Sequence, residues 1–204
     1  MASGDGLQTL LSIAAGLGLA AACGLRVFVP LLAAGAAARL GYLPLAAGFD
    51  WLATTPALIA LGTATLLEVG AYYVPWLDHV LDLVATPAAV GAGMLASMSV
   101  LTDLPPALRW GIGIIGGGGA AGLIQGATAL LRLKSTALTG GLANPVLATF
   151  ELAGAGLVAI IALMLPLMGL VLVMLIPVLA FRASGRLFFG RRPGRGWGDR
   201  PEGA

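Results

Sequence analysis

Charged residues are scarce in this chain of 204 residues: Asp, Glu, Lys and Arg make up 10% of it, whereas hydrophobic residues make up 59%. A soluble globular domain carries roughly a quarter of its residues as these four charged types. The scarcity of charge, together with a mean hydropathy of +0.98, therefore excludes an ordinary soluble domain. We expect an all-α protein that forms a polytopic bundle of membrane helices.

Cysteine and histidine are almost absent, with Cys23 and His79 as the only examples. A single cysteine excludes an intrachain disulfide and a cysteine cluster for zinc or iron–sulfur. The sequence also lacks the HExxH and GxSxG motifs, and the GxGxxG pattern that begins at Gly111 lies inside an apolar run with no strand before it. We therefore expect no enzyme activity, no catalytic residue, no cofactor and no metal.

Long segments without charge are plentiful, and each is near or above the ~20 residues that a membrane-spanning helix needs. The longest, residues 152–181, contains Pro166 and is better divided into two helices. We expect six spans, which are residues 6–25, 56–74, 87–102, 111–131, 145–165 and 167–181.

The last part of the chain, residues 184–204, is rich in Arg, Gly and Pro. This composition favours a disordered tail, and the positive-inside rule places it in the cytoplasm. A basic segment beside a span usually contacts anionic headgroups, so we expect the lipid bilayer rather than nucleic acid as its partner. Counting spans back from this tail makes the connection that carries Arg132 and Lys134 cytoplasmic as well.

Two segments of the chain resemble each other. Residues 14–26, "AAGLGLAAACGLR", and residues 120–132, "AAGLIQGATALLR", share seven identities over thirteen positions. Each is followed by a break and then by a helix that a proline opens, at Pro56 and at Pro145. We interpret the pattern as an inverted repeat of three plus three spans.

The repeat has consequences for topology. Its first unit is residues 1–105 and its second is residues 106–183, and inversion requires their first spans to point in opposite directions. That holds only if residues 27–38 are re-entrant and the N-terminus is cytoplasmic. The segment is short for a span and contains Pro30. The alternative, in which residues 27–38 cross the membrane and the N-terminus is external, stays open.

Four separated motifs point to a family. They are "GLRVFVPLL", "DWLATTPALIAL", "PWLDHVLD" and "KSTALTGGLANPVLATFE". Taken together in this order, they make the chain similar to a bacterial membrane family described as domain of unknown function 4126. The resemblance implies an integral membrane protein of about this size, and it implies no activity and no site residue. We expect a multi-pass protein of the bacterial cytoplasmic (inner) membrane.

Glu68 and Glu151 are the carboxylates inside the expected spans, where an ionisable group is costly and usually functional. The expected topology puts each about 9 Å from the cytoplasmic boundary. Thr65 and Tyr72 lie on the same helix face as Glu68 and can donate hydrogen bonds to it. Two interpretations stay open: a facing carboxylate pair that binds a cation or shares a proton, or two carboxylates that each bond backbone groups freed at a broken helix.

Further candidates lie at the ends of spans. Arg26 is expected to extend outward to the headgroups, with the binding of an anionic group as the alternative. Asn144 begins a helix and either contacts an ion or headgroup or acts as an N-cap. Asp78 and Asp82 are four residues apart and predict the solvated acidic face of a short interfacial helix rather than a metal site.

Small residues at four-residue spacing predict close helix packing. One such set is Gly118, Gly122 and Gly126, and the other is Gly16, Ala20 and Gly24.

The leading functional hypothesis is a small transporter or channel for an ion or small solute, coupled to a cation or proton through Glu68 and Glu151. The alternatives are translocation of a lipid or polyprenyl headgroup, in which Arg26 has the larger part, and a membrane scaffold without transport. Association as a homodimer stays open.

Overall fold

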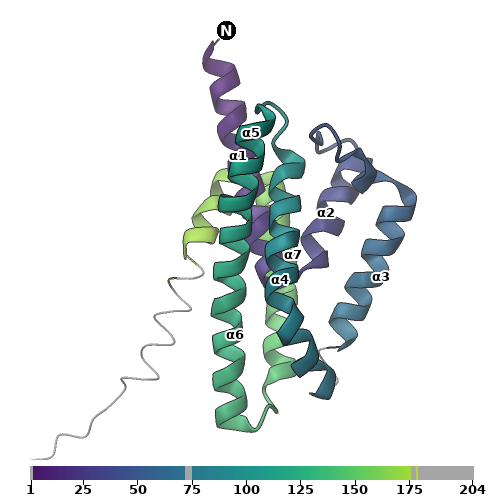
Figure 1. The fold of residues 1–204 in the computed structure, drawn as a ribbon, viewed down its shortest axis with the longest axis vertical. Coiled ribbons are helices and arrows are strands. Elements are labelled where there is room, and N and C mark those ends of the chain that lie inside the picture. Colours follow the sequence, from purple (N-terminus) through teal and green to yellow (C-terminus); the bar gives the residue numbers. More distant parts are fainter. Residues whose placement is uncertain (1, 72–74, 176–177, 179–204) are drawn as a thin grey trace, which may run out of the picture.

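The computed structural model describes residues 2–71, 75–175 and 178, and its described elements are all helices (Figure 1). They are α1 (Ala2–Leu25), α2 (Phe28–Arg39), the 3-10 turn η1 (Asp50–Ala53), α3 (Thr55–Ala71), α4 (Pro75–Val100), α5 (Pro106–Gly111), the π-helical segment η2 (Ile112–Gly118), α6 (Gly119–Thr139) and α7 (Asn144–Met164). A further helix, Pro166–Leu175, follows α7. The basic tail lies outside the described residues.

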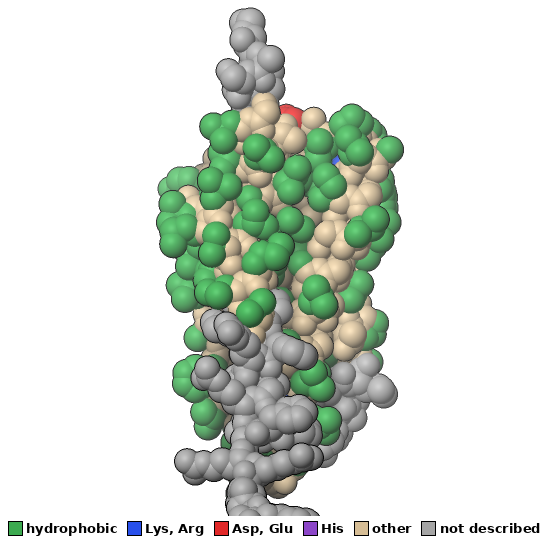
Figure 2. Space-filling view, turned by 90° about the vertical axis from the view of Figure 1, so that its left-hand side faces the viewer, with side chains coloured by type: hydrophobic (Ala, Val, Ile, Leu, Met, Phe, Trp, Pro, Cys, Tyr) green, Lys and Arg blue, Asp and Glu red, His purple; other side chains and the backbone are tan. Residues whose placement is uncertain are grey.

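Three helices in the described part are long and apolar enough to cross a membrane: Gly6–Leu25, Pro106–Thr139 and Asn144–Met164. Large hydrophobic side chains lie exposed along the face of the bundle that Figure 2 shows. Exposed hydrophobic residues occur on several helices, among them Leu66 in α3 (75% exposed) and Ile115 in η2 (79% exposed). A surface of this kind suits lipid and not water. The chain is therefore a helical membrane protein.

Three of the six expected spans coincide with the long apolar helices, and the other three coincide with helices shorter than a span. The segments 6–25, 111–131 and 145–165 lie in the three long helices, whereas 56–74, 87–102 and 167–181 correspond to shorter apolar helices. The predicted interfacial helix with Asp78 and Asp82 is the beginning of α4, which continues through Pro87 to Val100. The predicted end at residue 131 is wrong as well, because the helix continues to Thr139.

The inverted repeat predicted from the two similar segments is wrong. Gly116 lies against Leu17, and Gly24 lies against Ala121 and Ile124, so α1 and the helix Pro106–Thr139 run parallel. Inverted repeats would place these two helices in opposite directions. Shared small residues that permit close packing account for the similarity without duplication.

The direction of α1 bears on the two segments that the sequence predicts to be cytoplasmic. Figure 1 shows α1 beginning at the end of the bundle where α5 begins, opposite the turn between α6 and α7. The start of α1 and the 132–144 connection therefore lie at opposite ends of the bundle.

The helix α1 is the centre of the bundle and packs against α2, α4, α6 and α7. Its small residues permit this, as predicted for Gly16, Ala20 and Gly24: a Cβ on Gly24 would lie 2.4 Å from the Ala121 carbonyl oxygen. In the second predicted set, Gly118 and Gly122 lie against α4, whereas a Cβ on Gly126 would meet nothing within 4 Å.

The hairpin of α1 and α2 turns inside the bundle. Leu25 ends α1, Phe28 begins α2, and Arg26 between them is 2% exposed. The 12 residues of α2 extend about 18 Å, less than the ~30 Å of a hydrocarbon core. The chain therefore reverses where it is buried, and its backbone groups there need partners from the protein.

The helix α3 lies at the edge of the molecule. It packs mainly on α2 and η1, with a small contact to α4. Its apolar residues are at least partly exposed, and Glu68 is its one buried residue. A carboxylate therefore makes the most deeply buried contact of this helix.

Candidate functional site

The Glu68 carboxylate binds the N-terminus of α2. The Val27 N–H donates to Oε1 with an N···O distance of 2.8 Å, and the Phe28 N–H donates to Oε2 at 3.2 Å. The first N–H groups of a helix have no partner within the helix and carry its positive dipole end. Glu68 supplies both the acceptors and the negative charge that this buried helix end requires, as in the backbone-bonding alternative.

Arg26 points into the bundle. Its Nη2 donates to the carbonyl oxygen of Ala148 at 2.8 Å and lies 3.7 Å from Oε2 of Glu151. The prediction that Arg26 extends outward is wrong, because α1 ends inside the bundle and the guanidinium meets α7 before it could reach a surface.

Glu151 is bound by a second arginine. The Nε of Arg132 donates to Oε1 at 3.1 Å, and its Nη2 donates to Oε2. Such a two-point pair of guanidinium and carboxylate is a strong, directional contact. Arg132 is 4% exposed and lies about 10 Å before the end of α6. The predicted placement of Arg132 in a cytoplasmic connection is therefore wrong.

These four residues form one group, which we call the buried charge cluster: Arg26, Glu68, Arg132 and Glu151. The Glu68 carboxylate is attracted by Arg26 and repelled by Glu151, and its partner Val27 is next to Arg26 in the chain. With all four groups ionised, two positive charges balance two negative ones. The two carboxylates have different partners: Glu151 is bound by Arg132 and lies near Arg26, whereas Glu68 is bound by two backbone N–H groups.

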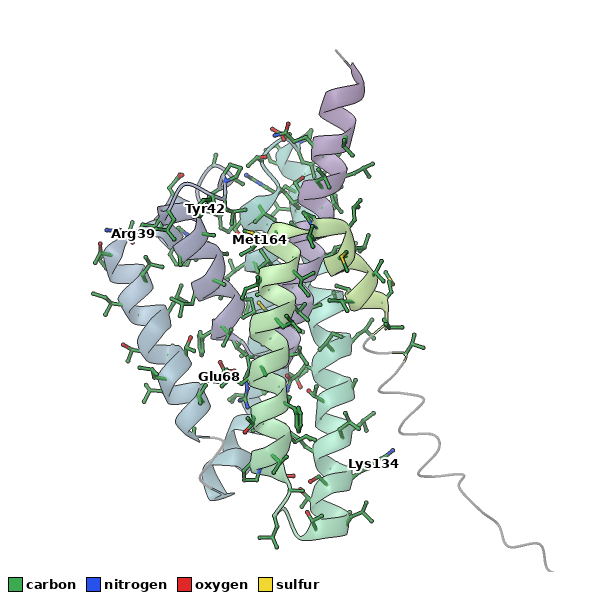
Figure 3. All side chains as sticks on the ribbon, turned by 180° about the vertical axis from the view of Figure 1, so that it is seen from behind. Arg39, Tyr42, Glu68, Lys134 and Met164 are labelled. Carbon is green, nitrogen blue, oxygen red and sulfur yellow. The ribbon has the colours of Figure 1, made fainter. Side chains whose placement is uncertain are left out.

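Figure 3 shows how the cluster relates to the surface. Glu68 lies between α3 and the rest of the bundle, whereas Lys134 points away from the bundle. Arg39 and Tyr42 lie near the other end of the molecule. The cluster is thus separate from the charged groups at the two ends.

A strip of polar side chains extends along α6 from the cluster, and sequence reasoning missed it. Gln125, Thr128 and Arg132 are spaced three and four residues apart, so they share one face, and all three are buried. Near the end of the helix, Thr136 accepts a hydrogen bond from Asn144 Nδ2 at 3.1 Å. The spacing within an otherwise apolar helix was the available signal. We call these four α6 residues the polar strip.

Other predicted site residues have different environments. The Thr65 hydroxyl donates to the Leu61 carbonyl in its own helix at 2.8 Å, so the predicted donation to Glu68 is wrong. Asn144 is the first residue of α7 and not its N-cap, which is Ala143. Tyr72 lies outside the described residues, as do the side chains of Asp78 and Asp82.

Two further observations limit the chemistry. Within the described ranges, no group of three His, Cys, Asp or Glu side chains could hold a metal ion.

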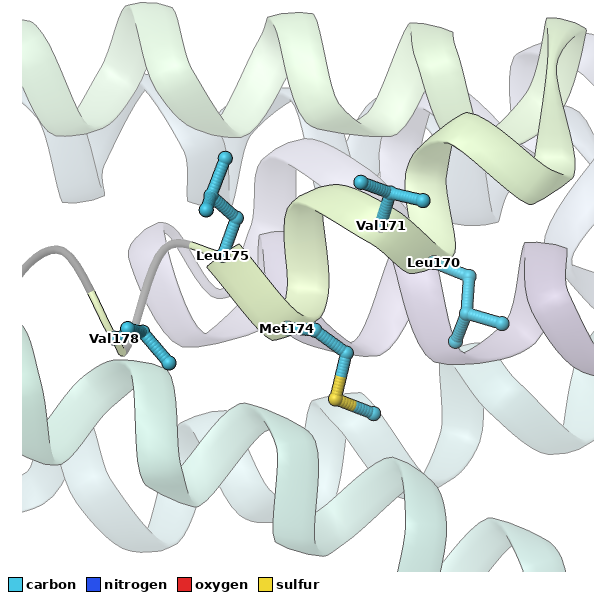
Figure 4. A pocket seen from close by; sticks show the side chains of 5 residues that line it. All are labelled: Leu170, Val171, Met174, Leu175 and Val178. Atoms are coloured by element: carbon cyan, nitrogen blue, oxygen red, sulfur yellow. The ribbon is translucent and has the colours of Figure 1, made fainter.

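An apolar groove of about 410 Å³ follows the helix after α7, and Leu170, Val171, Met174, Leu175 and Val178 line it (Figure 4). These side chains offer hydrocarbon surface and no hydrogen bond, so the groove suits lipid.

The sequence matches a known protein family. The sequence model described as "Domain of unknown function (DUF4126)" matches residues 13–186. The chain belongs to the DUF4126 family. The DUF4126 match includes all four residues of the buried charge cluster and the polar strip. No curated protein and no solved structure matches the chain significantly.

Proposed function

We propose that this protein is a small membrane transporter in which an ion or small solute passes the buried charge cluster. The observation that carries the proposal is the burial of four charged side chains beside the turn between α1 and α2. Their exposed fractions are 2% (Arg26), 4% (Arg132), 6% (Glu151) and 8% (Glu68). Each costs a few kcal/mol to place in a membrane, and such residues usually mark a transport path. The proposal assigns no enzymatic reaction to the chain.

The hairpin of α1 and α2 supports the proposal. We propose that α2 is a re-entrant helix, whose buried N-terminus is offered to a charged group as in transporters with discontinuous helices. The polar strip supports a route from the cluster toward the turn between α6 and α7. By the positive-inside rule we assign that turn and the basic tail to the cytoplasm of a bacterial inner membrane, and α1 then begins outside.

Labelling tests this orientation. Gly6→Cys and Leu142→Cys, each in a Cys23→Ala background, are treated with a membrane-impermeant maleimide on intact cells. We expect labelling of residue 6 from outside, and labelling of residue 142 only after the membrane is opened. Labelling of both residues from the same side would contradict the assignment.

A second candidate is translocation of a lipid headgroup. The observation that favours it is the peripheral place of α3, since lipid surrounds the helix that supplies Glu68. A headgroup phosphate could then reach the guanidinium groups laterally.

Reconstitution separates these functions. Liposomes with the purified protein are tested for flux of Na⁺, K⁺, chloride, nitrate and lactate, and for movement of a labelled phospholipid between leaflets. Glu68→Gln and Arg26→Gln are compared with the matched exposed variants Asp103→Asn and Arg39→Gln. Transport predicts solute flux that only the two cluster variants alter. Lipid movement without solute flux would favour the second candidate, and neither activity would contradict both.

A further inference from the structure

The four residues of the buried charge cluster come from helices that differ in how closely they pack against the rest of the protein. Arg26, Arg132 and Glu151 come from α1, α6 and α7, and α1 packs closely against both of the other helices. Glu68 comes from α3, in which it is the one buried residue. Of the four groups, Glu68 is therefore the one whose departure disturbs the fewest packed side chains.

Charge balance shows what the cluster requires when Glu68 leaves. Arg26 and Arg132 together with Glu151 carry a net charge of one positive unit, and the α2 N-terminus adds about half a unit. The Val27 and Phe28 N–H groups lose their acceptor at the same time. One singly charged anion with an oxygen acceptor, or a halide, satisfies the charge and both donors.

The same geometry disfavours a cation at this place. A cation bound through these two glutamates needs their carboxylate oxygens, but Glu151 is already held by the Nε and Nη2 of Arg132 and Glu68 by two backbone N–H groups. Arg26 lies 3.7 Å from Glu151 and repels a further positive charge. The cation coupling expected from the sequence therefore does not fit the contacts that these two carboxylates make.

The departing Glu68 carboxylate also needs compensation, because its helix lies at the edge of the molecule with exposed apolar side chains. A charged carboxylate facing lipid is costly, and a protonated one is much less so. Adding one proton to a Glu68 oxygen lets the neutral carboxyl group leave the α2 N-terminus. No other bond forms or breaks, and the two N–H hydrogen bonds pass from Glu68 to the anion.

We propose that the transporter carries one monovalent anion together with one proton, the anion replacing Glu68 at the α2 N-terminus beside Arg26. This inference rests on the proposed transport function and names its substrate class. Binding adds one positive and one negative charge, so the net charge of the cluster is unchanged. The charged groups of the described residues that act on Glu68 are Arg26 and Glu151, and the start of α2 contributes two backbone N–H groups. Glu68 in turn acts on the buried thiol of Cys23.

The test uses full-length protein in liposomes that contain a trapped pH-sensitive dye. Inward gradients of sodium nitrate, sodium chloride and sodium lactate are applied, with valinomycin and K⁺ holding the membrane potential at zero or at a set value. We expect at least one of these anions to acidify the interior at a rate that the potential does not change. Empty liposomes measure the passive leak of lactic acid.

Variants separate the proton from the anion. Glu68→Gln imitates the protonated side chain, so we expect anion uptake to continue, to become sensitive to potential and to lose its acidification. Arg26→Gln removes the positive charge, and we expect anion uptake to be lost. Asp103→Asn, the matched exposed carboxylate, should behave as the unaltered protein does.

Several results would overturn the proposal. Flux of Na⁺ or K⁺ without anion flux contradicts the substrate class. Anion flux that Glu68→Gln leaves coupled to protons contradicts the assigned role of Glu68. In both cases the proposed transport function stands. Absence of every flux contradicts both.

A measurement on the unaltered protein covers the case in which Glu68→Gln does not fold. Nitrate, chloride or lactate should raise the melting temperature in detergent, and more so at acidic than at neutral pH, because binding takes up a proton. A rise that is independent of pH, or its absence with all three anions, would contradict the proposal.

Discussion

The two carboxylates of the cluster are equally deep but differently held. Glu151 belongs to the tightly packed α7 and is bound at two points by Arg132, with Arg26 nearby. Glu68 belongs to the peripheral α3 and is bound by two backbone N–H groups. Under the proposed mechanism the difference corresponds to a division of roles, in which Glu151 neutralises charge that is fixed in the core and Glu68 is the exchangeable group.

The largest effect is expected from Glu151→Gln. The change removes the carboxylate that neutralises two buried guanidinium groups, and breaking a buried ion pair costs about 3–5 kcal/mol. Thermal unfolding in detergent should show a large fall in stability. The double variant Glu151→Gln/Arg132→Gln should recover much of the loss, and an equal or larger loss in the double variant would contradict the assigned role.

A smaller loss is expected from Glu68→Ala. Two N–H groups at the start of α2 lose a charged acceptor, which costs about 1.5–3 kcal/mol where no other partner replaces it. Glu68→Gln keeps one acceptor and should lose less. If Glu68→Ala were as harmful as Glu151→Gln in the same unfolding measurement, the two carboxylates would not differ as proposed.

Glycine substitutions extend the comparison to the helices themselves. Gly24→Ala places a Cβ 2.4 Å from the Ala121 carbonyl oxygen, and overpacking of this kind costs about 1–3 kcal/mol. In α3, a Cβ on Gly62 would meet nothing within 4 Å, so Gly62→Ala should stabilise the helix by about 0.5–1 kcal/mol. Equal destabilisation by both variants would show that α3 is packed as tightly as α1.

The smallest effect is expected from Thr65→Val. The hydroxyl bonds the Leu61 carbonyl in its own helix, and a substitution away from packed or charged groups usually changes stability by less than about 0.5 kcal/mol. Unfolding and flux should both match the unaltered protein. A loss of flux would place Thr65 in the path after all.

The chemistry of the site was largely visible in the sequence. Charged residues are so rare in the apolar segments that Arg26, Glu68 and Glu151 stood out individually. Their partners were not visible, because the choice between a facing pair and a capped helix depends on the direction in which each side chain points. Arg132 is hard to identify for a related reason: a basic residue usually marks the end of a span, whereas here α6 continues to Thr139.

The repeat shows a second limit of sequence reasoning. Residues 14–26 and 120–132 are similar because both belong to helices that need small residues for close contact, and the similarity contains no information on direction. Both segments end in Leu-Arg, and these two arginines, Arg26 and Arg132, approach the same carboxylate of Glu151. The shared arginine is the part of the similarity that corresponds to a common contact, and the parallel arrangement of the two helices brings both arginines to Glu151.

The most direct test of the central claim is the internal pH of liposomes that contain either the unaltered protein or Glu68→Gln. The account predicts that an inward gradient of at least one tested anion acidifies the lumen with the unaltered protein, and that Glu68→Gln takes up the same anion without acidification. Equal acidification by the two proteins would contradict the claim that Glu68 is the group that exchanges its place with the anion.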